Sequence, residues 1–120
     1  MKPALPTLTH DSLKPWFDKP ALINDCVAQV QKDLGSYGIA LHYSGMTENA
    51  YAELFEQLQP QISKLLHSNT TLMEILYRVD VSETAVRKAS EGNEEFSYSV
   101  TRLILWRELQ KVVTRFLLSK

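Results

Sequence analysis

Apolar residues follow helical spacing most continuously in the last segment of the chain, from Asn93 to Lys120. Neither Gly nor Pro interrupts this segment, and the four residues at 103–106 are all apolar. At 100° per residue, the apolar side chains of its two halves fall on nearly opposite sides of a helix. A helix that is apolar on every side is buried. The pattern therefore predicts a central helix over 94–118, with Asn93 as its N-cap.

The other apolar residues with helical spacing predict four shorter helices, over 21–34, 48–67, 71–79 and 81–91. Pro60 lies inside the second range, but the apolar stripe keeps its phase, which predicts one kinked helix or two nearly continuous ones. Thr71 and Glu74 have the spacing of a capping box at the start of the third helix. Asp80 and Ser82 compete as caps of the fourth helix, and Asp80 is preferred because it pairs with Glu83.

The first 20 residues carry four of the five prolines, which predicts an extended strap, 1–20, with Trp16 and Phe17 as its anchors. The alternative for these two aromatic residues is a partner-binding patch. Alternation around Leu41 predicts one short extended piece in a packed loop at 36–46, since no partner strand is visible. The sequence thus predicts an all-α fold, a compact bundle of about five helices around a long C-terminal helix.

Length and charge place the chain among soluble single-domain proteins. Its 120 residues predict one domain, 1–120, and a net charge of −1 implies no strong field toward nucleic acid or membrane. The single cysteine, Cys26, excludes an internal disulfide and is expected to be a buried, inert thiol. No apolar run is long enough for a membrane span, and the N-terminus lacks the apolar region of a signal peptide. We therefore expect a cytoplasmic protein.

Motifs that carry catalysis are missing from the sequence. The three histidines, His10, His42 and His67, are far apart and show no metal-binding spacing. No phosphate-binding loop, dinucleotide fingerprint, nucleophile elbow or CxxC pair occurs. The sequence therefore predicts no catalytic residue, no cofactor and no metal ligand, and hence a non-enzymatic protein.

A basic stripe marks the second half of the C-terminal helix. Arg107, Lys111 and Arg115 are successive i,i+4 neighbours, whose like charges repel, and Glu108 offsets part of this repulsion. Asp80 and Glu83 are candidate counterions, because the helix that carries them leads into this one. The alternative is a surface for an anion or an acidic partner, although three cations give little nucleic-acid affinity.

Two short stretches, LYRVDVSE at 76–83 and RELQKV at 107–112, resemble patterns in a group of small uncharacterised bacterial helical proteins. The resemblance covers roughly the C-terminal half of the chain. It implies a compact all-helical cytosolic protein, and it supplies no activity. It also implies that the polar residues of the two stretches form one cluster: Arg78, Asp80, Arg107, Glu108 and Lys111.

These patterns favour a small interaction or adaptor module that contacts a protein partner or a second copy of itself. Trp16, Phe17 and Phe116 are its expected apolar contact residues. The alternative function is an accessory protein that binds nucleic acid or another polyanion through the basic stripe.

Overall fold

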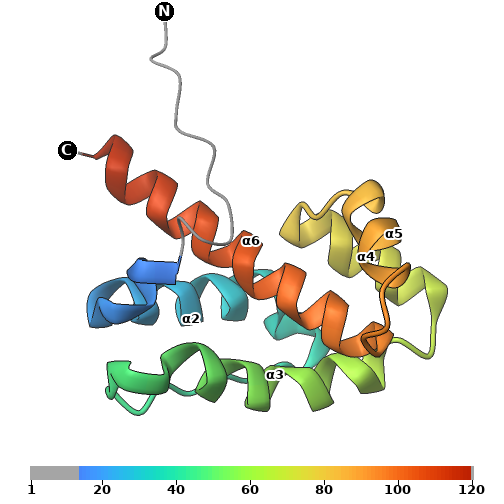
Figure 1. Ribbon diagram of the computed structural model, residues 1–120, viewed down its shortest axis with the longest axis horizontal. Coiled ribbons are helices and arrows are strands. Elements are labelled where there is room, and N and C mark those ends of the chain that lie inside the picture. Colours follow the sequence, from blue (N-terminus) through green and yellow to red (C-terminus); the bar gives the residue numbers. More distant parts are fainter. Residues whose placement is uncertain (1–13, 120) are drawn as a thin grey trace, which may run out of the picture.

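The last helix, α6 (Phe96–Leu118), runs through the middle of the molecule, and the other helices pack around it (Figure 1). The computed structural model describes residues 14–119. Within this range the fold is all-α, and four further α-helices surround α6: α2 (Pro20–Leu34), α3 (Ala50–Leu65), α4 (Asn69–Val79) and α5 (Glu83–Ser90). The prediction of a helical bundle around a long C-terminal helix is therefore confirmed.

Aliphatic side chains from α2, α3, α4 and α6 form the core. Ile104, Leu105 and Leu109 of α6 are fully buried, together with Ile23 of α2 and Leu54 of α3. Ile104 and Leu105 are neighbours in sequence and so point to different sides of α6. This double burial confirms that α6 is enclosed near its middle, because a helix at the surface buries only one stripe.

Proline is accommodated differently in α2 and α3. Pro20 occupies the first turn of α2, where its missing N–H costs nothing. Pro60 lies inside α3, which continues as a single helix from Ala50 to Leu65. Of the two predicted alternatives, one kinked helix or two nearly continuous helices, the structure has the single helix. The predicted helix at 48–67 begins later than expected, because its first turn is a separate 3₁₀ helix, η3 (Thr47–Asn49).

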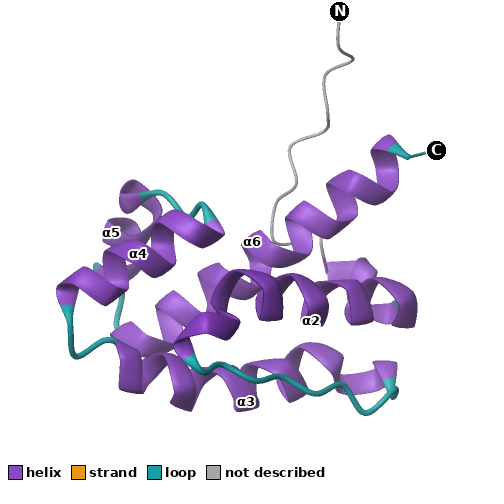
Figure 2. Cartoon of the chain, turned by 180° about the vertical axis from the view of Figure 1, so that it is seen from behind, coloured by secondary structure: helices purple, strands orange, loops and turns teal. Residues whose placement is uncertain are grey.

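An extended segment at 39–44 lies along α2 and α3 without a partner strand in the described chain (Figure 2). It pairs instead with side chains of α3. Gln61 bonds the N–H and the C=O of Ala40 at 2.9 and 2.8 Å, and Gln57 bonds those of His42 at 2.8 and 2.7 Å. Four residues of a helix and two residues of an extended chain both advance by about 6 Å. The spacing of Gln57 and Gln61 on α3 therefore matches that of His42 and Ala40 on the segment. The predicted extended piece in a packed loop is therefore present.

Serines cap the two short helices, and both preferred caps were wrong. Ser68 Oγ accepts from the Thr71 N–H at 3.3 Å, so α4 begins at Asn69. Ser82 Oγ accepts from the Ala85 N–H at 3.1 Å, so α5 begins at Glu83. Asp80 instead ends α4 in a left-handed conformation, with φ 69°. An N-cap needs an extended backbone, which excludes Asp80 from that role.

The start of α6 also differs from its prediction. Its N-cap is Glu95, whereas Asn93 lies before the helix. The two glutamates accept hydroxyl hydrogen bonds from the first turn, Glu95 from Ser97 at 2.9 Å and Glu94 from Ser99 at 2.8 Å. These carboxylates are thus placed where the helix dipole favours negative charge.

The predicted N-terminal strap lies mostly outside the described residues, which begin at residue 14. Its last part is a 3₁₀ helix, η1 (Lys14–Asp18), that packs against α2 and α3. Trp16 in this turn is half-buried against the core, as expected for an anchor.

Candidate functional site

Each cation of the predicted basic stripe on α6 is engaged inside the molecule. Arg107 pairs with Asp80 at 2.8 Å and also donates to Gln110 at 2.9 Å. Lys111 pairs with Asp33 at 2.8 Å, and Arg115 donates to Gln29 at 2.6 Å. The stripe is therefore a set of interhelical contacts, and its main counterion besides Asp80 is a residue of α2.

Arg107 holds the turn between α4 and α5. Its Nε donates to the main-chain oxygen of Asp80 at 3.0 Å, while its terminal nitrogen donates to the carboxylate of the same residue. The guanidinium, through hydrogen bonding first and charge second, keeps the pKa of Asp80 below its ordinary value. A residue that is left-handed and not glycine is strained, so this double contact stabilises the turn.

Lys111 lies between two carboxyl groups, those of Asp33 on α2 and of Glu108 on α6. Its Nζ is 2.8 Å from Asp33 Oδ2 and 3.0 Å from Glu108 Oε1. The side chain of Glu108 is fully buried, while those of Lys111 and Asp33 are 18% and 14% exposed. One cation thus faces two acids in a place that water barely reaches.

Burial and the hydrogen bond with Asp33 raise the pKa of Glu108 from 4.5 to about 8, against the opposing effect of Lys111. Burial also acts to raise the pKa of Asp33, but hydrogen bonds from Glu108, Lys111 and Gln29 outweigh it and hold that pKa below its ordinary value. Glu108 Oε2 accepts no hydrogen bond from a described residue. A proton on Glu108, donated to Asp33, satisfies both carboxyl groups and balances the charge of Lys111.

Cys26 lies in the core near this cluster. Burial, followed by the charge of Glu108, raises the pKa of its thiol to about 12. A thiol is a nucleophile only as the thiolate, which such a pKa suppresses near neutral pH. Cys26 is therefore the buried, inert thiol that its apolar surroundings predict.

Two residues of the predicted polar cluster, Arg78 and Glu83, lie apart from its other members. The guanidinium of Arg78 is 5.4 Å from the ring centre of Tyr37 in a cation–π contact. Glu83, at the first position of α5, is exposed and forms no ion pair within residues 14–119. Of the two candidate counterions, Asp80 alone pairs with the stripe.

Two of the predicted apolar contact residues, Trp16 and Phe116, are half-buried and pack against each other. The rings of Trp16 and Phe116 are 5.7 Å apart in an edge-to-face arrangement, which joins η1 to the end of α6. The side chain of Phe17 lies outside the described set. Trp16 and Phe116 are thus used in packing, as their aromatic geometry favours.

Asp33 and Gln29 are the members of the α2–α6 cluster that sequence reasoning missed. They are one turn apart on α2, and Gln29 donates to Asp33 at 3.0 Å. Both interrupt the buried side of α2, which also carries Cys26 and Val30. The sequence signal for these two residues was a polar i,i+4 pair beside an apolar stripe. This signal does not show which cation of another helix, here Lys111, would meet the pair.

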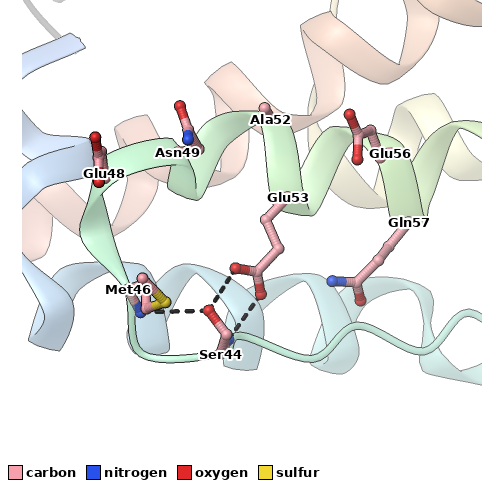
Figure 3. A pocket seen from close by; sticks show the side chains of 8 residues that line it. All are labelled: Ser44, Met46, Glu48, Asn49, Ala52, Glu53, Glu56 and Gln57. Atoms are coloured by element: carbon pink, nitrogen blue, oxygen red, sulfur yellow. Dashed lines mark hydrogen bonds between the residues drawn. The ribbon is translucent and has the colours of Figure 1, made fainter.

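An open groove of about 540 Å³ lies where η3 meets α3. Glu53 and Gln57 point from α3 toward the extended segment (Figure 3). Both oxygens of Glu53 accept from Ser44, one from its N–H and one from its hydroxyl, each at 2.7 Å. These polar groups hold the loop in place, since the backbone and the side chain of Ser44 together engage both oxygens of the Glu53 carboxylate.

Within residues 14–119, no group of three or more His, Cys, Asp or Glu side chains is arranged to hold a metal ion. None of the helices in the same range is long and apolar enough to cross a membrane. Comparisons of the chain with known protein families, curated proteins and solved structures found no match.

Proposed function

We propose that this protein is a small non-enzymatic interaction module whose contact surface is the outer face of α4. The observation that carries the proposal is the exposure of two large side chains one turn apart on that helix. Met73 is 47% exposed and Tyr77 is 88% exposed. Residues four apart lie on the same side of a helix, so the two form one strip.

The opposite side of α4 keeps this strip in a fixed position. Ile75, Leu76 and Val79 are buried against the core, so α4 is held firmly while its outer face stays open. Tyr is enriched at the centres of protein interfaces, and Met adapts to irregular surfaces. A rigid helix that presents both side chains loses little conformational entropy when it binds.

The alternative, nucleic-acid binding through Arg107, Lys111 and Arg115, has less support. Each of these cations already donates to Asp80, Asp33 or Gln29. A phosphate would have to displace these contacts. Catalysis by Glu108 has no support either, because a fully buried carboxyl group meets no substrate. A cytoplasmic location is part of the same proposal and is in keeping with the single buried thiol.

A binding experiment with a matched control tests the proposal. The immobilised chain is used to capture proteins from an extract of the source cell. Each captured protein is then purified, and its affinity for the chain is measured directly. The double variant Met73→Gln/Tyr77→Gln should weaken the affinity about tenfold or more, since buried anchor residues dominate interfaces. The control Met46→Gln/Leu118→Gln removes two other exposed apolar side chains, 68% and 61% exposed, and should retain the affinity.

Self-association is measured with the same variants by light scattering over a range of protein concentrations. A dimer that the α4 variant abolishes and the control retains would identify a second copy as the partner. The proposal is wrong if neither self-association nor direct binding of any purified protein occurs, or if both double variants lose affinity equally.

A further inference from the structure

α4 and α5 together have the construction of a helix-turn-helix. Three residues, 80–82, connect the two helices. The first of them, Asp80, is left-handed, and the last, Ser82, caps α5. A connection of three or four residues is typical of this motif, in which the second helix enters the major groove of DNA. Figures 1 and 2 show both helices as an arm at one side of the molecule, beside α6.

The second helix of this arm is attached by one side only. None of the eight described residues of α5 is buried, and its partly buried side chains are the small apolar ones: Ala85, Val86 and Ala89. The other side is open, and it carries Glu83, Thr84, Arg87 and Lys88. Because α5 packs on α6, this open side is presented by a supported helix rather than a loose one.

The cations of α5 are free, in contrast to those of α6. Neither Arg87 nor Lys88 forms an ion pair with any residue of the described chain. Both are exposed and adjacent in sequence in the last turn of α5. Unpaired, closely spaced cations on an open helix are complementary to the phosphates of nucleic acid.

We propose that the open side of α5 binds double-stranded DNA in its major groove. Glu83 and Thr84 occupy the N-terminal positions, which contact base edges in this motif. A carboxylate accepts from the cytosine amino group, and a hydroxyl can bond to several bases. Arg87 and Lys88 contact phosphates and set the register. This inference uses α5 and goes beyond the proposed function, which uses the outer face of α4.

Acidic residues limit the strength of this interaction. Glu83 begins the helix and Glu91 follows it, so the open side carries mixed charge. With two phosphate-contacting cations, affinity depends on salt less steeply than in strongly basic domains, and low salt is required to measure it. Glu83 would favour particular DNA sequences, because a carboxylate is repelled by phosphate and can accept hydrogen bonds from few base edges.

Duplexes that bind the protein are first selected from a pool of random sequences. Fluorescence anisotropy with a labelled, selected duplex of about 20 base pairs at about 20 mM salt then tests the proposal. In the variant Arg87→Ala/Lys88→Ala, the affinity for the selected duplex should be lower by about tenfold or more. The slope of log affinity against log salt concentration should become shallower by the equivalent of about two phosphate contacts. The control Lys32→Ala/Lys64→Ala changes the net charge equally on α2 and α3, where both lysines are exposed, and should bind nearly as wild type.

Loss of sequence preference in Thr84→Ala, with little change in affinity for unselected DNA, is expected if α5 reads bases. The proposal is overturned if the wild-type protein does not bind any duplex at low salt. Equal losses in the two double variants, or equal binding to single-stranded DNA, would also overturn it. Because Met73 and Tyr77 remain in all these variants, failure here leaves the outcome of the α4 experiment unaffected.

Discussion

Arg107 on α6 makes two hydrogen bonds to Asp80, one to its main-chain oxygen and one to its carboxylate. Asp80 is the one residue other than glycine with a positive φ among residues 14–119. The arginine thus holds the α4–α5 turn in its strained conformation and ties it to the central helix. Arg107, for which the sequence offers Asp80 as a candidate counterion, is therefore a structural support for the arm.

Substitution of Arg107 should loosen the arm while leaving the rest of the molecule folded. In Arg107→Lys the planar fork is lost, so one group cannot reach both oxygens of Asp80. Hydrogen exchange should become faster for the amides of α5 and of the turn, and much less so for the middle of α3. Arg102→Lys is the control, since Arg102 pairs with Glu94 near the start of α6. Equal acceleration in both variants would contradict this role.

Stability should decrease as the pH rises from about 5 to about 8. The folded pKa of Glu108 lies above its ordinary value of 4.5, so its contribution is complete below that value and is lost as the pH rises through about 8. The free energy of unfolding should fall by at most about 1.4 kcal/mol per pH unit in this window. The lowered pKa of Asp33 acts in the opposite direction, but its contribution is lost only in acid, below pH 3.8.

Urea unfolding of Glu108→Gln at several pH values isolates this contribution. The amide is neutral at every pH, can accept from Lys111 and can donate to Asp33. The variant should match the wild type near pH 5 and be more stable than it near pH 9. Identical slopes for the two proteins would mean that Glu108 does not hold a proton in the folded state.

Removal of the Lys111 charge should destabilise the protein strongly. Lys111→Met leaves Asp33 without its cation in a place that is largely shielded from water, which costs about 3 kcal/mol or more. The double variant Lys111→Met/Asp33→Asn should recover part of this loss, since no unpaired charge remains. Lys32→Met removes an exposed lysine from the same end of α2 and should change stability little. Thermal or urea unfolding measures all three, and a small effect of Lys111→Met would show that water compensates Asp33.

The side-chain pairing of α3 with the extended segment can be tested at Gln57. Gln57→Ala removes a donor and an acceptor for the backbone of His42, at a cost of about 1–2 kcal/mol. Amide exchange at His42 should accelerate more than exchange in the core of α3. Glu56→Ala, on the neighbouring exposed position, should not change it. Unchanged protection at His42 in Gln57→Ala would indicate that the contacts of Gln61 and Glu53, with the packing of Ile39 and Tyr43, order the segment without Gln57.

Periodicity was sufficient to predict most of the helices but few of their caps. Apolar stripes extend over many residues, so α2, α3 and α6 were recognised within about two residues of their bounds. Caps depend on one side chain and on local φ and ψ, and Asp80, Ser82 and Asn93 all have suitable side chains. Asp80 ends α4 in a left-handed conformation, and the arginine that binds it lies 27 residues away in the sequence.

The sequence by itself determined the helical class, the central position of α6 and the apolar burial of Cys26, because these depend on local spacing and on hydrophobicity. Only the tertiary structure decided how the charges are paired. Asp33 and Lys111 are separated by 78 residues, and their contact depends on how α2 crosses α6. Interactions between exposed charges are screened beyond about 8–10 Å at ordinary salt, so the role of a charged residue is set by the neighbours that the fold brings to it.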